Sequence, residues 1–266
     1  MKDNIKKFDP ESYKGTYEYY VKHRPGIPEE VINVIVKHFD IKPSDRVLDI
    51  GCGTGQVALA MEGKCGGMVC LDPDPEMLKW ARKATKGSKI KLTWLNYGAE
   101  DLGKTKGRLG TFKVATISRA FHRMNQGQAL KDLEDLIEKD GGVAIFSDRV
   151  LWGGQEEWQQ SVKMVIQKYL GEKRPAGPDE LWENILARSI FRFIKTHDVP
   201  IVRSWGVESI IGYVFSTAFA APRLFGDQLD KFKEEIKNTL LSINLEGVFQ
   251  DNAVWSIVLG SKESRE

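Results

Sequence analysis

The first 150 residues alternate between short apolar runs and longer segments whose apolar residues recur every three or four positions. A short apolar run between glycines or polar residues is typical of a buried strand, whereas the longer recurrence is typical of an amphipathic helix. The runs predict strands at residues 46–50, 68–71, 90–95, 112–117 and 143–146. The recurrences predict helices at residues 31–39, 56–62, 75–84 and 130–137, the last stopped by Gly141 and Gly142. This alternation indicates a parallel sheet in an α/β fold.

Helical periodicity dominates the chain beyond residue 150. An apolar stripe from Trp158 to Tyr169 predicts one helix, and residues 173–178 break it with glycine, prolines and charges. Further helices are predicted at residues 179–194, 207–219 and 227–241, and strands at residues 199–205 and 253–259. No internal repeat or low-complexity tract interrupts this order.

The composition favours a globular protein that acts on small molecules. The 266 residues are 41% hydrophobic and 29% charged, which allows a core of ordinary size and argues against disorder. No apolar run reaches the ~18 residues of a membrane span, and the N-terminus lacks a signal peptide's apolar core. We therefore expect a cytoplasmic protein that does not bind a membrane. A net charge of +2 argues against a nucleic-acid partner, and the sequence leaves the oligomeric state open.

The three cysteines, Cys52, Cys65 and Cys70, form no C-x-x-C pair. They are too few and too close together for a disulfide framework, so we interpret them as buried thiols. We expect no metal site.

A glycine-rich turn follows the first predicted strand, with glycines at Gly51, Gly53 and Gly55. Glycine lets a backbone turn sharply and approach a ligand closely, and the helix after it directs free N–H groups at the turn. Asp49 interrupts the apolar strand, and we expect its buried carboxylate to accept hydrogen bonds from amides of the loop. The dinucleotide fingerprint G-x-G-x-x-G would need glycine at position 56, where this chain has Gln56.

The stretch from Asp49 to Gly55 resembles motif I of the class I methyltransferases that use S-adenosylmethionine, and matches it residue for residue. The resemblance implies a doubly wound, Rossmann-like, mostly parallel seven-stranded sheet with S-adenosylmethionine as cofactor and S-adenosylhomocysteine as product. It further implies that the loop wraps the methionine part of the cofactor. The residues that it assigns there are Asp49, Gly51, Cys52, Gly53 and Gly55. A bare structural turn is the alternative.

Asp72 ends the second predicted strand, 17 residues after Gly55. An acid at this place can accept both hydroxyls of a ribose, and the family resemblance assigns it that contact. Asp74 is instead an expected helix N-cap, because Pro75 follows it as the first helical residue. Pro73 and Met77 adjoin the acid, and we expect them at the cofactor too.

Two further segments resemble cofactor contacts of the family. Tyr20-x-x-x-Arg24-Pro25-x-x-Pro28 is similar to an N-terminal segment that closes over the cofactor, which implies that Tyr20 and Arg24 contact the methionine carboxylate. A surface arginine beside a proline turn is the alternative. Residues 97–102 resemble Gly-Asp-Ala-Glu-Asp-Leu, which contacts adenine. Gly98 replaces the first acid, so the candidates are Ala99 and Glu100, and a solvated acidic turn is the alternative.

The fourth predicted strand ends in a polar segment that begins at Ser118 and contains His122. Strands one and four are neighbours in the methyltransferase order, so this segment and the glycine loop should face one cleft. Related enzymes have Phe-His-Trp-Met-Asp here, whereas this chain has Arg123 and Asn125 at the third and fifth positions. Ser118, Arg119 and Phe121 are expected at the cofactor. His122 is a candidate general base, or else a residue that caps a helix or packs on the cofactor.

The complete arrangement is similar to the trans-aconitate methyltransferase type, in which helices inserted between the final two strands cover the substrate pocket. The expected division is an N-terminal helical lid (1–42), a cofactor-binding core (43–150), a helical cap with one core strand (151–252), and the last strand and tail (253–266). The aromatic residues Trp152, Trp158, Phe215 and Phe219 either line that pocket or form the cap's own core.

We therefore expect methyl transfer to a small organic acceptor, at a carboxylate or hydroxyl oxygen, by in-line displacement. The Asn/Asp-Pro-Pro-Tyr/Phe motif of enzymes that methylate amides and nucleobases is absent after the fourth strand. Nitrogen or carbon methylation of a small metabolite is the first alternative. A non-catalytic protein that binds the cofactor and a nicotinamide-dependent oxidoreductase are the others.

Overall fold

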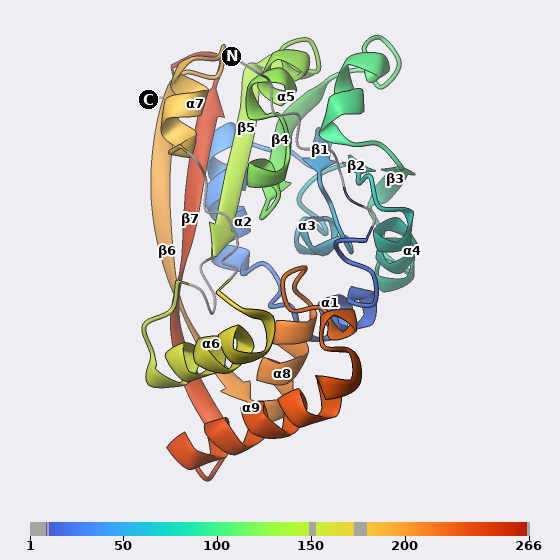
Figure 1. The fold of residues 1–266 in the computed structure, drawn as a ribbon. Helices are drawn as coiled ribbons and strands as arrows, with labels where there is room; N and C mark the ends of the chain where they lie inside the picture. Colours follow the sequence, from blue (N-terminus) through green and yellow to red (C-terminus); the bar gives the residue numbers. More distant parts are fainter. Residues whose placement is uncertain (1–8, 10, 149–152, 173–179, 265–266) are drawn as a thin grey trace.

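The computed structural model describes residues 9, 11–148, 153–172 and 180–264. The described residues form a seven-stranded sheet in the order β3-β2-β1-β4-β5-β7-β6 (Figure 1). β1 pairs in parallel with β2 and β4, whereas β7 runs antiparallel to both β5 and β6. The expected doubly wound, mostly parallel sheet is thus confirmed.

The strands occupy the following bounds: β1 Arg46–Ile50, β2 Gly67–Leu71, β3 Lys91–Leu95, β4 Phe112–Ser118, β5 Ile137–Asp148, β6 Phe193–Gly206 and β7 Val248–Ser261. The α-helices are α1 Tyr17–His23, α2 Glu29–Phe39, α3 Gln56–Ala60, α4 Pro75–Ala84, α5 Gln126–Leu133, α6 Glu157–Leu170, α7 Trp182–Ala187, α8 Val207–Phe215 and α9 Leu229–Ile243. Short 3-10 helices include η1 Ala99–Thr105 and η2 Phe121–Arg123.

Two apolar layers enclose the sheet. On one face α2, α3 and α4 pack through residues such as Ile35, Val57 and Leu78. On the other face α5 and α7 pack through residues such as Leu130 and Leu186. The central strands are buried on both faces, which explains why their sequences are continuous apolar runs.

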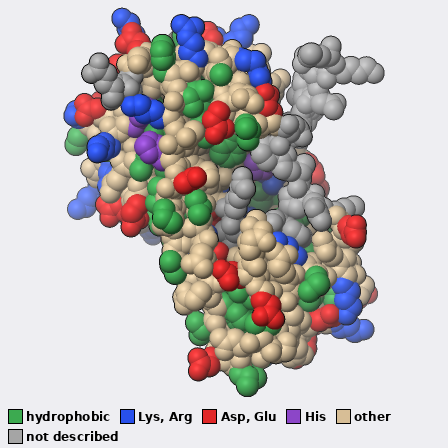
Figure 2. Space-filling view, turned by 90° about the vertical axis from the view of Figure 1, so that its left-hand side faces the viewer, with side chains coloured by type: hydrophobic (Ala, Val, Ile, Leu, Met, Phe, Trp, Pro, Cys, Tyr) green, Lys and Arg blue, Asp and Glu red, His purple; other side chains and the backbone are tan. Residues whose placement is uncertain are grey.

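Helices α6, α8 and α9 form a separate cap beyond one end of the sheet (Figure 1). β6 and β7 stay paired beyond the ends of the other strands and reach this cap, where Trp205 and Phe249 join its apolar core. Trp158 and Phe215 also lie in that core, and they line neither of the two cavities described below. The exposed side chains on the face of the molecule shown in Figure 2 mix both signs of charge.

Two of the expected elements were wrong. Residues 188–194 are not helical, because β6 begins at Phe193, where it pairs with Ser261 of β7. Gly141 and Gly142 do not stop a helix but lie inside β5. A Cβ on Gly142 would lie 2.2 Å from the carbonyl oxygen of Gly260, so close approach of the neighbouring strand requires glycine there.

The last strand begins at Val248, earlier than the expected residue 253, because the whole segment pairs with β6. Trp152 and the expected break at residues 173–178 lie outside the described residues. The N-cap role of Asp74 is confirmed, since its Oδ1 accepts hydrogen bonds from the amides of Glu76 and Met77.

Candidate active site

A cavity of 490 Å³ opens at the carboxyl ends of β1, β2 and β4, within the size range of small-molecule sites. Its lining comes from the N-terminal segment, the segments that follow β1, β2, β3 and β4, and Ala218 and Phe219 of the cap. The residues of the sequence prediction that line it are Tyr20, Gly51, Gly53, Asp72, Pro73, Met77, Ala99, Glu100, Ser118, Arg119 and His122. Tertiary folding thus brings most of the predicted site together.

Five predicted residues do not line this cavity. Asp49 is 1% exposed beneath the loop, and Cys52 is also buried. Phe121 is fully buried and packs edge-on against Trp182. Gly55 packs near Trp94, and Arg24 lines a neighbouring cavity. These residues support the site from behind or lie beside it.

The three loop glycines have positive φ angles, and a Cβ at each of them would meet a different neighbour. At Gly51 (φ 69°) a Cβ would lie 2.6 Å from the Cβ of Ala120, so the loop after β4 excludes a side chain. At Gly55 (φ 83°) it would lie 3.0 Å from Trp94. At Gly53 (φ 52°) the nearest atom is the Tyr20 hydroxyl, 3.9 Å away. Of the three, Gly53 is therefore the position where a Cβ would meet its neighbour at an ordinary van der Waals distance.

Asp72 stabilises the glycine loop directly. Its Oδ2 accepts a hydrogen bond from the Gly53 amide at 2.8 Å, and its Oδ1 accepts one from the Asp74 amide at 2.9 Å. Burial raises the pKa of Asp72 to about 6, although the two amide hydrogen bonds oppose this rise. The acid is 8% exposed, and it still borders the cavity.

Asp49 does not accept hydrogen bonds from loop amides, so this expectation was wrong. Its Oδ1 accepts a hydrogen bond from the Thr116 hydroxyl of β4 at 2.8 Å, and its Oδ2 has no described partner. The loop amide of Gly53 donates its hydrogen bond to Asp72 instead. Burial raises the pKa of Asp49 to about 7, opposed by the Thr116 hydrogen bond.

We expect Asp49→Asn to stabilise the protein at pH 8 by about 1–2 kcal/mol, because it removes a buried charge but keeps a partner for Thr116. A carboxyl whose folded pKa lies above its unfolded pKa of about 3.9 contributes stability that is complete below that unfolded value and is lost as pH rises through about 7. Urea unfolding at pH 5 and pH 8 measures this loss. An Asp49→Asn variant that kept the pH dependence of the wild type would contradict the assignment.

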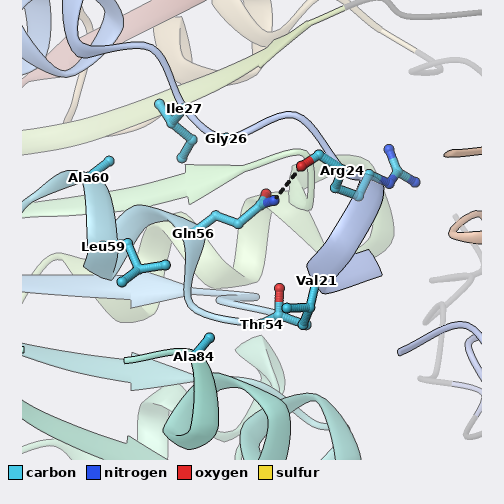
Figure 3. A pocket seen from close by; sticks show the side chains of 9 residues that line it. All are labelled: Val21, Arg24, Gly26, Ile27, Thr54, Gln56, Leu59, Ala60 and Ala84. Carbon is cyan, nitrogen blue, oxygen red and sulfur yellow. Dashed lines mark hydrogen bonds between the residues drawn. The ribbon is translucent and has the colours of Figure 1, made fainter. Parts of the chain in front are cut away.

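Arg24 belongs to a second cavity of 390 Å³ lined by residues such as Val21, Thr54 and Leu59 (Figure 3). Its guanidinium points away from the other labelled residues of that cavity. The guanidinium carbon is 5.0 Å from the ring centroid of Tyr20 and 4.9 Å from that of Tyr213. Nη1 is 3.4 Å from the Tyr213 hydroxyl, whereas Nε is buried without a partner among the described residues.

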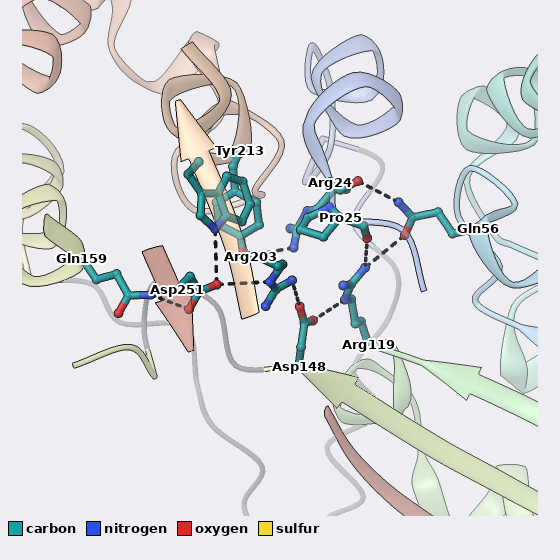
Figure 4. A network of polar contacts seen from close by, with 10 residues as sticks. Arg24, Pro25, Gln56, Arg119, Asp148, Gln159, Arg203, Tyr213 and Asp251 are labelled. Carbon is teal, nitrogen blue, oxygen red and sulfur yellow. Dashed lines mark hydrogen bonds and ion pairs between the residues drawn. The ribbon is translucent and has the colours of Figure 1, made fainter. Parts of the chain in front are cut away.

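A buried ionic network that the sequence analysis missed joins the site to the cap (Figure 4). Asp148, at the carboxyl end of β5, accepts hydrogen bonds from Arg119 Nε at 2.6 Å and Arg203 Nη1 at 2.7 Å. Arg203 Nε is also 3.2 Å from Asp251 Oδ2. Although burial opposes it, the two guanidiniums lower the pKa of Asp148 to about 2. The position of Asp148 at the same sheet edge as Asp72 was the available signal.

The main cavity is also lined by residues beyond the predicted cofactor set. His122 and Phe219 line it, as do Tyr13, Arg123 and Met124, which the sequence analysis did not assign. The Arg123 guanidinium carbon is 5.0 Å from the ring centroid of Tyr13. Arg123 and Met124 adjoin His122 in the chain, and this was the signal that could have found them.

Among the described residues, no group of three or more His, Cys, Asp or Glu side chains is arranged to hold a metal ion. Within the same part of the chain, no helix has both the length and the apolar character needed to cross a membrane. Cys52, Cys65 and Cys70 are free and buried.

Comparison with known proteins identifies the core. Residues 47–141 match the family model described as a methyltransferase domain. CRG1 of Saccharomyces cerevisiae, described as a probable S-adenosylmethionine-dependent methyltransferase, is 26% identical over 130 residues, which cover 48% of this chain and 44% of the relative. The ubiquinone biosynthesis O-methyltransferase of Xanthomonas campestris is 28% identical over 105 residues, covering 40% and 43%. The matched part is less than half the length of either relative.

Solved structures share the whole architecture. A SAM-dependent methyltransferase from Geobacter sulfurreducens in complex with S-adenosyl-L-homocysteine superimposes with a TM-score of 0.52. The superposition covers 95% of this chain and 98% of that chain at 14% sequence identity. At this identity the likeness establishes the fold. The narrower trans-aconitate type stays a prediction.

Proposed function

Since residues 47–141 form a class I methyltransferase domain, we propose that the protein binds S-adenosylmethionine and transfers its methyl group to an oxygen of a small organic acceptor. The observation that carries this proposal is the cavity at the carboxyl ends of β1, β2 and β4, which combines the glycine loop, Asp72 and His122. The crevice beyond these strand ends is where doubly wound sheets bind their ligands.

The methionine end of the cofactor fits the loop beside Tyr20 and Arg24. The described network contains three guanidiniums, from Arg24, Arg119 and Arg203, but only two carboxylates, from Asp148 and Asp251. The buried Nε of Arg24 has no partner in the described part of the chain. A ligand carboxylate would supply both the missing negative charge and the missing acceptor, because buried charges need partners.

The nucleoside end fits the opposite side of the cavity. Asp72 borders the cavity and has acceptor capacity beyond the two amides, since each carboxylate oxygen has two lone pairs. Ala99 and Glu100 of η1 and Met77 of α4 complete this side. We assign the ribose to Asp72 and the adenine to the segment around Ala99.

The bound cofactor supplies a sulfonium methyl that a nucleophile attacks in line. The protein's own contribution is to hold the acceptor atom close to that methyl and to exclude water. When the acceptor atom carries a proton, the protein also removes that proton. His122 lines the cavity and is the candidate for this proton. The relative described as an O-methyltransferase supports an oxygen acceptor.

We expect His122→Ala to lower kcat by about 10²-fold or more, with a much smaller change in cofactor affinity, if His122 is the general base. The control is His197→Ala, an exposed histidine on β6 that borders no described cavity. Single-turnover rates and calorimetric titration with S-adenosylhomocysteine separate the two quantities. Wild-type turnover in the His122→Ala variant would assign His122 to packing.

Calorimetry with S-adenosylmethionine, S-adenosylhomocysteine and NAD tests the donor site. We expect micromolar binding of the first two and none of NAD, because Gln56 replaces the third glycine of the dinucleotide fingerprint. Binding of NAD alone would overturn the proposal in favour of an oxidoreductase. Mass spectrometry against a panel of acids, phenols and amines then tests the acceptor, and methylation only at nitrogen or carbon would overturn the oxygen assignment.

A further inference from the structure

Two side chains hold consecutive backbone carbonyls where the N-terminal segment leaves α1. Gln56 Nε2 donates a hydrogen bond to the Arg24 carbonyl at 3.4 Å, and Arg119 Nη1 donates one to the Pro25 carbonyl at 3.2 Å (Figure 4). The two side chains also contact each other, because Arg119 Nη1 donates to Gln56 Oε1 at 3.0 Å. The Gln56 amide thus connects the start of α3 with the N-terminal segment through Nε2 and with Arg119 through Oε1.

Arg119 is held in one orientation from its far side. Asp148 accepts from its Nε at 2.6 Å, and its guanidinium carbon lies 4.6 Å from the ring centroid of Trp255. The side chain of Arg119 is 12% exposed and that of Asp148 is 2% exposed. Arg119 also adopts a φ of 55°, which is uncommon for a residue with a side chain and persists only where the surroundings enforce it.

Helix α1 needs such external support. It has seven residues and none of them is buried, whereas an isolated helix of this length is unstable in water. Its Tyr20 nevertheless faces Gly53 of the glycine loop and stacks on Arg24. Tyr19 packs against Phe215 of α8 at a ring-centroid distance of 5.3 Å, so the position of α1 depends both on this contact and on how the chain is held immediately after the helix.

We infer that Gln56, Arg119 and Asp148, which we call the lid clamp, are positioning residues that hold α1 over the methionine end of the cofactor site. Gln56 and Arg119 hold the carbonyls, and Asp148 acts through Arg119. The inference rests on the proposed function for the ligand that α1 covers, but the clamp itself is a property of the free protein. The clamp assigns a positioning role to Gln56, the residue that replaces the third glycine of the dinucleotide fingerprint.

Gln56→Met tests the clamp, because it removes both hydrogen bonds while it keeps the length and neutral charge of the side chain. The matched control is Glu235→Gln in α9, which weakens an ion pair with Lys168 far from the cavity. Hydrogen exchange of the ligand-free proteins measures the amides of residues 17–24. We expect them to exchange about tenfold faster in the Gln56→Met variant, with α9 unchanged, and to be unaffected in the control.

Affinity and turnover provide the second measurement. We expect Gln56→Met to weaken binding of S-adenosylhomocysteine, and to raise KM for S-adenosylmethionine, by about tenfold, while kcat changes less than about threefold, on the order-of-magnitude scale of two hydrogen bonds. Unchanged exchange of residues 17–24 would overturn the clamp whatever the protein binds. Faster exchange with wild-type affinity would overturn its role at the ligand. A wild-type protein that binds neither ligand, with exchange altered as expected, would refute the proposed function and leave the clamp as a structural element.

Discussion

Asp148→Ala is expected to lower the free energy of unfolding by about 3–5 kcal/mol, because it leaves two buried guanidiniums without their shared carboxylate. Asp148 is 2% exposed, and its two oxygens accept separately from Arg119 and Arg203. No described carboxylate can replace it for Arg119, whereas Arg203 keeps Asp251. Urea denaturation at pH 7 measures the loss, since the urea midpoint reports stability.

The matched control for this prediction is Asp198→Ala on β6, an exposed acid that accepts a hydrogen bond from Ser256. Its loss should change stability by less than about 1 kcal/mol. Equal effects of the two substitutions would contradict a special contribution of the buried network.

Because of Asp148, we also expect the free energy of unfolding to decrease at acid pH. The folded pKa of Asp148, about 2, lies below the unfolded value of about 3.9, so its contribution is present above that unfolded value and is lost as pH falls through about 2. The direction is opposite to that of Asp49 and Asp72, whose raised pKa values reduce stability as pH rises through about 6–7. The stability of the Asp148→Ala variant should therefore no longer fall as pH decreases through about 2. Its loss of stability as pH rises through about 6–7 should equal that of the wild type.

Asp72→Ala is expected to weaken binding of S-adenosylhomocysteine by about 1–3 kcal/mol, the range for leaving buried polar groups unpaired. The substitution removes the acceptor proposed for the ribose and also the hydrogen bonds to the Gly53 and Asp74 amides. The glycine loop then loses a contact that orders it before the ligand arrives. Calorimetric titration at pH 8, where a carboxyl with a pKa of about 6 is ionised, measures the change.

The matched control for Asp72 is Asp135→Ala, an exposed acid that pairs with Lys106 at 2.9 Å. The affinity of this control should equal that of the wild type, because Asp135 does not border the cavity. Asp72→Asn should lie between the two, since an amide keeps one acceptor oxygen. An unchanged titration for Asp72→Ala would contradict the ribose assignment.

Local sequence patterns predicted the elements around the donor site well. β1, β2 and the N-cap at Asp74 follow from apolar runs, glycines and a proline within a few residues of each other. The predictions of a helix stop at Gly141 and Gly142 and of a helix over residues 188–194 were wrong. The structure of these segments depends instead on pairing with strands distant in the chain. Close backbone approach and long-range pairing override local periodicity there.

The sequence by itself determined the succession of strands and helices along the chain, the glycine loop and the acids near it, because each depends on residues close together in the sequence. Only the tertiary structure decided which side chains meet. It placed Asp49 beside Thr116 and the Gly53 amide beside Asp72. It also brought together Arg119, which follows β4, Asp148 of β5 and Arg203 of β6. The physical reason is that a buried charge is satisfied by whichever partner packing places beside it, and that partner is set by the strand order and the cap rather than by neighbours in sequence.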